Sequence, residues 1–152
     1  MTNPVPTILV IFGASGHLTA RKLAPAIFNL SKDNLLPQNC FLIGVGRTPM
    51  EDKAFRDYLK NSLDKHSRRA IEKEEWQKLE SKIFFHTGAY DDLESFTTLE
   101  EKILGLEKDL GMESQCLFYI STPPNVFEPI LDNLGESGLA KRNHGTQFAS
   151  KV

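Results

Sequence analysis

Residues 7–19 read TILVIFGASGHLT, an apolar run that ends directly in a loop of small residues. An unbroken apolar run of this length predicts a strand buried on both faces, as in a parallel sheet covered by helices on each side. Gly13 permits a tight turn after the strand, and Gly16 lets the backbone come close to a phosphate at the start of a helix. The stretch therefore predicts a strand, a phosphate-binding loop and a helix.

The glycines of this loop have the spacing Gly-x-x-Gly, and Thr19 stands where the dinucleotide-binding fingerprint has a third Gly or Ala. Ala14 and Ser15 are small and keep the loop open. The alternative is a tight strand–helix turn that binds nothing. The strand before the loop and the helix after it favour the nucleotide site.

Other apolar runs predict four more strands, at residues 40–45, 82–87, 116–120 and 147–152. Apolar residues spaced by three and four between them predict helices that bury one face. The charged stretches 51–65 and 71–81 predict surface helices, and Pro25 predicts a kink or an early break in the first helix. The expected buried faces are Leu23, Ala26, Ile27 and Leu30; then Phe96, Leu99, Ile103, Leu106 and Leu110; and finally Val126, Phe127, Ile130, Leu131 and Leu134, with Gly135 and Gly138 available to stop the last helix.

This alternation predicts an α/β fold, a Rossmann-like doubly wound parallel sheet with helices on both faces, in a single domain over residues 1–152. The final apolar run has no helix after it, which indicates a cut through a larger protein.

Composition excludes several classes of protein. The chain is 40% hydrophobic and 25% charged with a net charge of −2, which gives no case for binding nucleic acid or a membrane. No basic segment precedes the first apolar run as a secretory signal would require. We expect Cys40 and Cys116 to be buried reduced thiols in a cytoplasmic protein, and the scattered Cys and His residues predict no metal site.

The end of the second strand predicts the cofactor. An NAD site usually has Asp or Glu there for the ribose hydroxyls, but this strand ends in Gly44-Val-Gly-Arg47. Arg47 offers a fork of donors suited to a 2′-phosphate, so NADP is predicted. The alternative is that Arg47 is a solvated loop residue. Of Arg21 and Lys22 on the following helix, at most one faces the ligand.

Three segments in order resemble the glucose-6-phosphate dehydrogenase family. Residues 11–25, IFGASGHLTARKLAP, resemble its opening motif G-A-S-G-D-L-x-x-R-K-L-x-P. Gly44-Val-Gly-Arg47 resembles the end of its second strand, and residues 118–127, FYISTPPNVF, resemble its segment F-Y-L-A-x-P-P-x-x-F beside the cofactor.

The resemblance implies NADP-dependent oxidation of glucose 6-phosphate to 6-phosphogluconolactone, the first step of the pentose phosphate pathway. It implies a homo-oligomer for the full-length protein and a Lys22 that reaches toward substrate and cofactor. The cofactor-binding residues implied are Gly13, Ala14, Ser15, Gly16, His17, Leu18, Arg47, Thr122 and Pro123.

The chain departs from the family pattern in two ways. His17 replaces the family's Asp, which changes the charge next to the phosphates. The E-K-P and R-I-D-H-Y motifs and the catalytic His of the second domain have no match here, so no catalytic residue is expected in this chain and no turnover by it alone.

Two other readings remain open. One is a stand-alone, non-catalytic dinucleotide-binding module. The other, an extended reductase, would need a Tyr-x-x-x-Lys pair, but the tyrosines at 58, 90 and 119 are followed four residues later by Ser62, Glu94 and Pro123.

Overall fold

The computed structural model describes residues 6–16, 19–33, 35–36, 39–66, 72–111, 113–139 and 147–150. Its strands form one parallel sheet in the order β3-β2-β1-β4-β5, which confirms the predicted sheet. Residues 17 and 18 lie outside the described ones. The strands are β1 (Thr7–Phe12), β2 (Cys40–Gly46), β3 (Ile83–Thr87), β4 (Gln115–Ile120) and β5 (Gln147–Ser150).

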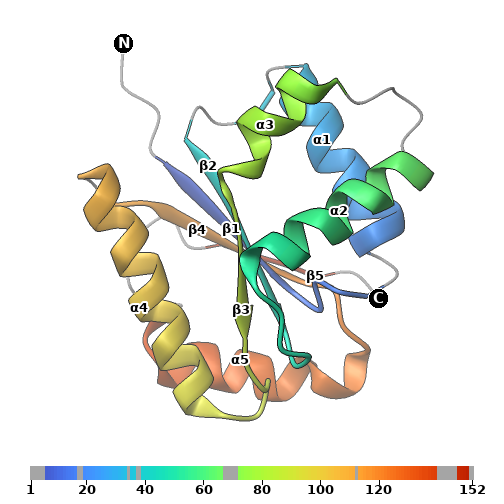
Figure 1. The fold of residues 1–152 in the computed structure, drawn as a ribbon. Coiled ribbons are helices and arrows are strands. Elements are labelled where there is room, and N and C mark those ends of the chain that lie inside the picture. The colour runs from blue at the N-terminus through green and yellow to red at the C-terminus, as the bar shows by residue number, and fades with distance from the viewer. Residues whose placement is uncertain are drawn as a thin grey trace.

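Helices cover both faces of the sheet, as Figure 1 shows. α1, α2 and α3 lie on one side, and α4 and α5 lie on the other. The predicted doubly wound arrangement is therefore confirmed. The helical elements are η1 (Thr19–Leu23), α1 (Ala24–Lys32), α2 (Asp52–His66), α3 (Lys73–Glu80), α4 (Leu93–Leu110), η2 (Pro124–Val126) and α5 (Phe127–Glu136).

The central strand β1 contributes to two separate core clusters because successive side chains point to opposite faces. Val10 and Phe12 pack toward α4 and α5, whereas Ile11 packs toward α1, α2 and α3. Phe12 is stacked on Phe96 of α4, with ring centroids 5.7 Å apart. The sheet is thereby held between two hydrophobic layers, and its strand ends stay free to build a site.

The expected buried face of the first helix is wrong in part. Ala26 is exposed and Leu30 is 40% exposed, while Ala24 and Phe28 are buried instead. All four residues lie within the regular helix α1, downstream of η1, so the prediction chose the wrong face of the helix: Ala24, Ile27 and Phe28 also have helical spacing, and Phe28 brings the larger apolar surface to the sheet. The expected interruption at Pro25 is found here, because α1 begins beside it.

The face of α5 also differs from the expectation. Ile130 and Leu134 are buried as predicted, but Leu131 is 49% exposed. Asn133 is buried in its place, and its side-chain amide donates to the Tyr90 carbonyl oxygen at 2.9 Å. A polar residue therefore anchors α5 to the segment after β3. Gly135 lies inside α5 and does not end it.

The two thiols differ in burial. Cys116 on β4 is buried as expected, but Cys40 at the start of β2 is only half-buried. Burial raises the pKa of the Cys40 thiol, which keeps it protonated and weakly reactive. Within the described residues, no helix has the length and apolarity needed to cross a bilayer.

We expect His86 on β3 to make the stability of the fold depend on pH. Burial lowers the pKa of His86, against its ring hydrogen bond with the Ser95 carbonyl oxygen at 2.8 Å; nearby Lys102 lowers it further. Below pH about 6.5 the unfolded chain therefore takes up a proton that the folded chain resists. Neutral His86 therefore makes its full contribution to the free energy of unfolding above that pH, and this contribution decreases as the pH falls.

We expect His86→Gln to flatten the fall in stability between pH 7.5 and 5, a range chosen to bracket the histidine transition. Urea unfolding of both proteins across this range is the measurement. Carboxylates titrate in both proteins alike, so the difference between the two curves isolates His86. Two parallel curves would contradict the assignment.

Candidate functional site

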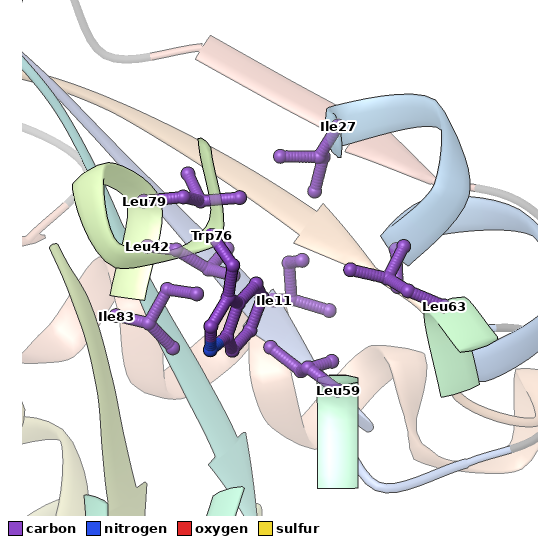
Figure 2. Close-up of a pocket in the computed structure, with 9 residues that line it drawn as sticks. Ile11, Ile27, Leu42, Leu59, Leu63, Trp76, Leu79 and Ile83 are labelled. Atoms are coloured by element: carbon purple, nitrogen blue, oxygen red, sulfur yellow. The ribbon is translucent and has the colours of Figure 1, made fainter. Parts of the chain in front are cut away.

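The structure contains a small apolar cavity that is too small to hold a nucleotide. It lies between the sheet and helices α1, α2 and α3, and Trp76 of α3 points into it (Figure 2). Its volume of about 20 Å³ is close to that of one water molecule, and its lining is almost wholly apolar. It is a packing gap in the core, bounded by Ile11, Ala24, Ile27, Leu42, Leu59, Leu63, Trp76, Leu79 and Ile83.

A larger and more polar cleft lies at the carboxyl ends of β1, β2 and β4. The strand order reverses direction at β1, and open α/β sheets bind ligands in the crevice at such a point. The cleft encloses about 280 Å³. Its lining consists of Gly13, Ser15, Gly16, Arg47, Thr48, Tyr90, Ser121, Thr122, Pro123, Asn125 and Val126.

Gly13 brings the loop close to the neighbouring strand. Its φ of +84° is a left-handed conformation that favours glycine, and a Cβ there would lie 2.3 Å from the Ser121 carbonyl oxygen. Its amide donates to the Val45 carbonyl oxygen at 2.9 Å, and the Gly16 amide donates back to Gly13 at 3.0 Å. The turn is therefore closed by its own backbone and by the ends of β2 and β4.

Ala14 supports the loop from beneath. Its side chain is fully buried in the cluster with Phe55 of α2, and its amide donates to the Val45 carbonyl oxygen at 3.2 Å. A Cβ on Gly44 would lie 2.7 Å from the Ala14 Cβ and 2.4 Å from Phe55. Small residues on β2 and in the loop are thus needed for α2 to pack, and Ala14 does not line the cleft.

Tyr58 of α2 contacts the same loop from the outside. Its hydroxyl donates to the Ser15 carbonyl oxygen at 3.0 Å and lies 3.4 Å from that of Gly16. Burial raises the pKa of Tyr58, although its side-chain hydrogen bond with Ser62 lowers it, so the phenol is a donor at neutral pH. The loop is consequently held by α2 as well as by the strands.

The Arg47 side chain lies at the rim of the cleft, over the aromatic ring of Tyr90, which follows β3. Its guanidinium lies 5.6 Å from the ring centroid of Tyr90, and Tyr90 is buried. The Tyr90 hydroxyl is 3.4 Å from the Val45 carbonyl oxygen, the acceptor that the loop amides also use. Burial raises the pKa of Tyr90, against the lowering effects of a Gly13 backbone hydrogen bond and the Arg47 charge. A cation–π contact therefore orients the exposed arginine.

The cleft brings together most of the residues that the sequence singled out. Gly13, Ser15, Gly16 and Arg47 line it, as do Thr122 and Pro123 after β4. Four residues are not among the described lining residues. Ala14 packs beneath the loop, Lys22 is exposed on η1 outside the lining, and His17 and Leu18 lie outside the described residues.

Sequence reasoning missed other lining residues, namely Thr48, Tyr90, Ser121, Asn125 and Val126. Each closely follows the end of a strand or belongs to the segment after β4. The carboxyl ends of parallel strands meet at one edge of the sheet, and that rule could have found them. Among the described residues, no three potential metal ligands come together.

Comparison with known proteins identifies the family. Residues 10–149 match the model of the glucose-6-phosphate dehydrogenase NAD-binding domain. The chain belongs to the glucose-6-phosphate dehydrogenase family. A glucose-6-phosphate 1-dehydrogenase from Chlamydia muridarum is 35% identical over 143 residues, which are 93% of this chain and 28% of that protein. A chloroplastic one from Nicotiana tabacum is 34% identical over 78% of this chain and 20% of its own length.

Solved structures of this family have the same fold. A glucose-6-phosphate dehydrogenase in complex with its substrate glucose-6-phosphate superposes with a TM-score of 0.83 at 27% identity, over 100% of this chain and 31% of that one. The glucose-6-phosphate 1-dehydrogenase of Mycobacterium avium gives a TM-score of 0.82 at 23% identity and supports the fold alone. The chain thus spans under a third of these relatives. Its matched part is a nicotinamide dinucleotide-binding domain.

Proposed function

We propose that residues 1–152 form the NADP-binding domain of a dehydrogenase that oxidises glucose 6-phosphate to 6-phosphogluconolactone. One observation carries the choice of NADP over NAD: Arg47 is the only charged side chain among the described residues that line the cleft. A site for the unphosphorylated ribose usually offers a carboxylate at this strand end. A lone guanidinium instead favours the 2′-phosphate.

The described residues fit a dinucleotide. The loop approaches β4 so closely that a Cβ on Gly13 would occupy the space, and the loop residues Ser15 and Gly16 face the cleft. The pyrophosphate would lie at this loop, the 2′-phosphate at Arg47, and the nicotinamide half along Thr122 and Pro123. When bound, the cofactor would accept hydride from the sugar.

This chain supplies only the cofactor side of the reaction. The motifs that hold the substrate phosphate and the proton-accepting His in the resembled family have no match here. We therefore expect the isolated chain to bind NADP without turnover, with the sugar-phosphate ligands and the subunit contacts of a homo-oligomer supplied by a further domain. A stand-alone dinucleotide-binding module is the second candidate, since the cleft is lined by residues from the ends of β1, β2 and β4 in this one sheet. The reading frame after Val152 distinguishes the two candidates. Continuation through E-K-P and R-I-D-H-Y motifs would support the dehydrogenase, and a stop codon would support the stand-alone module.

Calorimetric titration of the purified chain with NADP and with NAD tests the proposal. We expect saturable binding of NADP at least about tenfold tighter than that of NAD, because charge-assisted hydrogen bonds to one phosphate contribute on that scale. Equal affinity for the two nucleotides, or tighter binding of NAD, would overturn the choice of cofactor. Binding of neither would overturn the proposed domain function.

A further inference from the structure

We propose that Tyr58 is a positioning residue of the dinucleotide site, whose hydroxyl holds the phosphate-binding loop in its binding conformation. Tyr58 lies on α2 and is not among the residues that line the cleft. It would act on the nucleotide only through the loop backbone. This role rests on the proposed function, because the loop must receive a pyrophosphate for its geometry to matter.

The contact acts on the part of the loop that has the least packing of its own. Ala14 is fully buried, but Ser15 is exposed, and Gly16 has no side chain. The Tyr58 hydroxyl donates to the Ser15 carbonyl oxygen at 3.0 Å and lies 3.4 Å from the Gly16 carbonyl oxygen. A peptide unit is planar, so fixing its carbonyl fixes the direction of the N–H that follows. The N–H of the Ser15–Gly16 peptide is the one that donates to the Gly13 carbonyl oxygen at 3.0 Å, so the Tyr58 hydroxyl holds the peptide that closes the turn.

The helix that carries Tyr58 is itself fixed to the sheet. The Asp52 carboxylate accepts from the Phe85 amide at 2.7 Å, and the Arg56 Nε donates to the Ile83 carbonyl oxygen at 2.8 Å. Phe55 and Leu59 on the same helix are buried against the sheet. Two polar anchors and a buried face therefore hold α2 on β3, within two turns before Tyr58. The hydroxyl is a fixed point relative to the strands.

A surface tyrosine without a role would be expected to turn its hydroxyl to water. The Tyr58 ring is half-buried instead, and its hydroxyl reaches a loop that is 43 positions earlier in the chain. A single hydrogen bond of this kind contributes on the order of threefold to tenfold in an equilibrium. That scale suits a residue that tunes the loop and does not decide whether the domain folds.

The test compares Tyr58→Phe with the wild-type chain, using two probes. NADP contains both the pyrophosphate and the 2′-phosphate, whereas adenosine 2′-monophosphate lacks the pyrophosphate and depends on Arg47. We expect Tyr58→Phe to bind NADP about threefold to tenfold more weakly, with the affinity for adenosine 2′-monophosphate changed by less than about twofold. Tyr119→Phe is the matched control, because Tyr119 packs on the α1 side of the sheet and is outside the cleft lining.

Hydrogen exchange without nucleotide gives a second readout. In Tyr58→Phe the loop around Gly13 and Gly16 should exchange faster, while β3 and the rest of α2 exchange as in the wild type. Unchanged loop exchange, or equal weakening of both probes, would overturn the positioning role even where wild-type NADP binding is strong. Wild-type protein that binds no NADP would overturn the proposed function, and with it this role.

Discussion

Gly13→Ala is expected to lower the melting temperature of the chain by about 4–20 °C. The left-handed backbone at φ +84° costs an alanine about 1–2 kcal/mol. The added Cβ would also lie 2.3 Å from the Ser121 carbonyl oxygen and 2.9 Å from a Thr122 methyl. Relieving this overlap moves β1 away from β4, which costs about another 1–3 kcal/mol. At roughly 2–4 °C per kcal/mol for a chain of this size, the sum gives the stated shift.

Gly111→Ala is the matched control for Gly13→Ala. Gly111 ends α4 at φ +74°, but a Cβ there would meet no atom within 4 Å. It should therefore show the backbone cost alone, a drop of only a few degrees. Thermal unfolding followed by the fluorescence of buried Trp76 measures both variants. If the two variants lose equal stability, the close approach of the loop to β4 is not what requires glycine at residue 13.

Gly13→Ala should also abolish measurable NADP binding, because the loop and the Ser121–Thr122 segment line the same cleft. A loop displaced by even an ångström presents its peptides in the wrong place. Calorimetry below the lowered melting temperature separates this loss from unfolding. Wild-type affinity in a folded Gly13→Ala protein would show that the loop adapts.

The sheet was predictable because its central strands β1 and β2 are buried on both faces. Such strands appear in sequence as unbroken apolar runs, and β1 was bounded correctly from its composition alone. The loop was predictable for a similar reason, since Gly13 follows the strand directly and no other residue fits there. Local chemistry determines both features.

The face of the first helix was not predictable from periodicity. Two overlapping apolar faces of α1 fit the same helical period, and the one that contains Ala24 and Phe28 is buried while Leu30 is exposed. Periodicity gives the spacing of a buried face but does not choose between two faces of similar apolarity. Tertiary packing determines it.

The partners of the site residues come from distant parts of the chain. Arg47 was predicted from its own strand end, but Tyr90 beneath it follows β3, and Tyr58 reaches the loop from α2. Pairing them requires knowledge of which strand lies beside which. The sequence therefore indicates the ligand chemistry, and the topology shows how the ligating groups are held.

Arg47→Ala is expected to weaken NADP binding by about 10- to 100-fold and to leave NAD binding within about twofold. A guanidinium bound to a phosphate contributes roughly 1.5–3 kcal/mol, which corresponds to that range. The unphosphorylated ribose of NAD gains nothing comparable from the arginine. Arg47 is exposed and its side chain rests on the Tyr90 ring at the rim of the cleft, so its loss should barely change the melting temperature.

Arg47→Lys separates charge from geometry. Lysine keeps the positive charge but loses the planar fork and the stacking surface over the Tyr90 ring, 5.6 Å away. We expect an intermediate NADP affinity that falls more steeply with salt than that of the wild type, because a flexible ammonium depends more on charge alone. Equal loss of NADP and NAD in Arg47→Ala would mean that the arginine supports the cleft as a whole. Arg47 would then have no part in selecting the 2′-phosphate, and the preference for NADP would lose its structural basis.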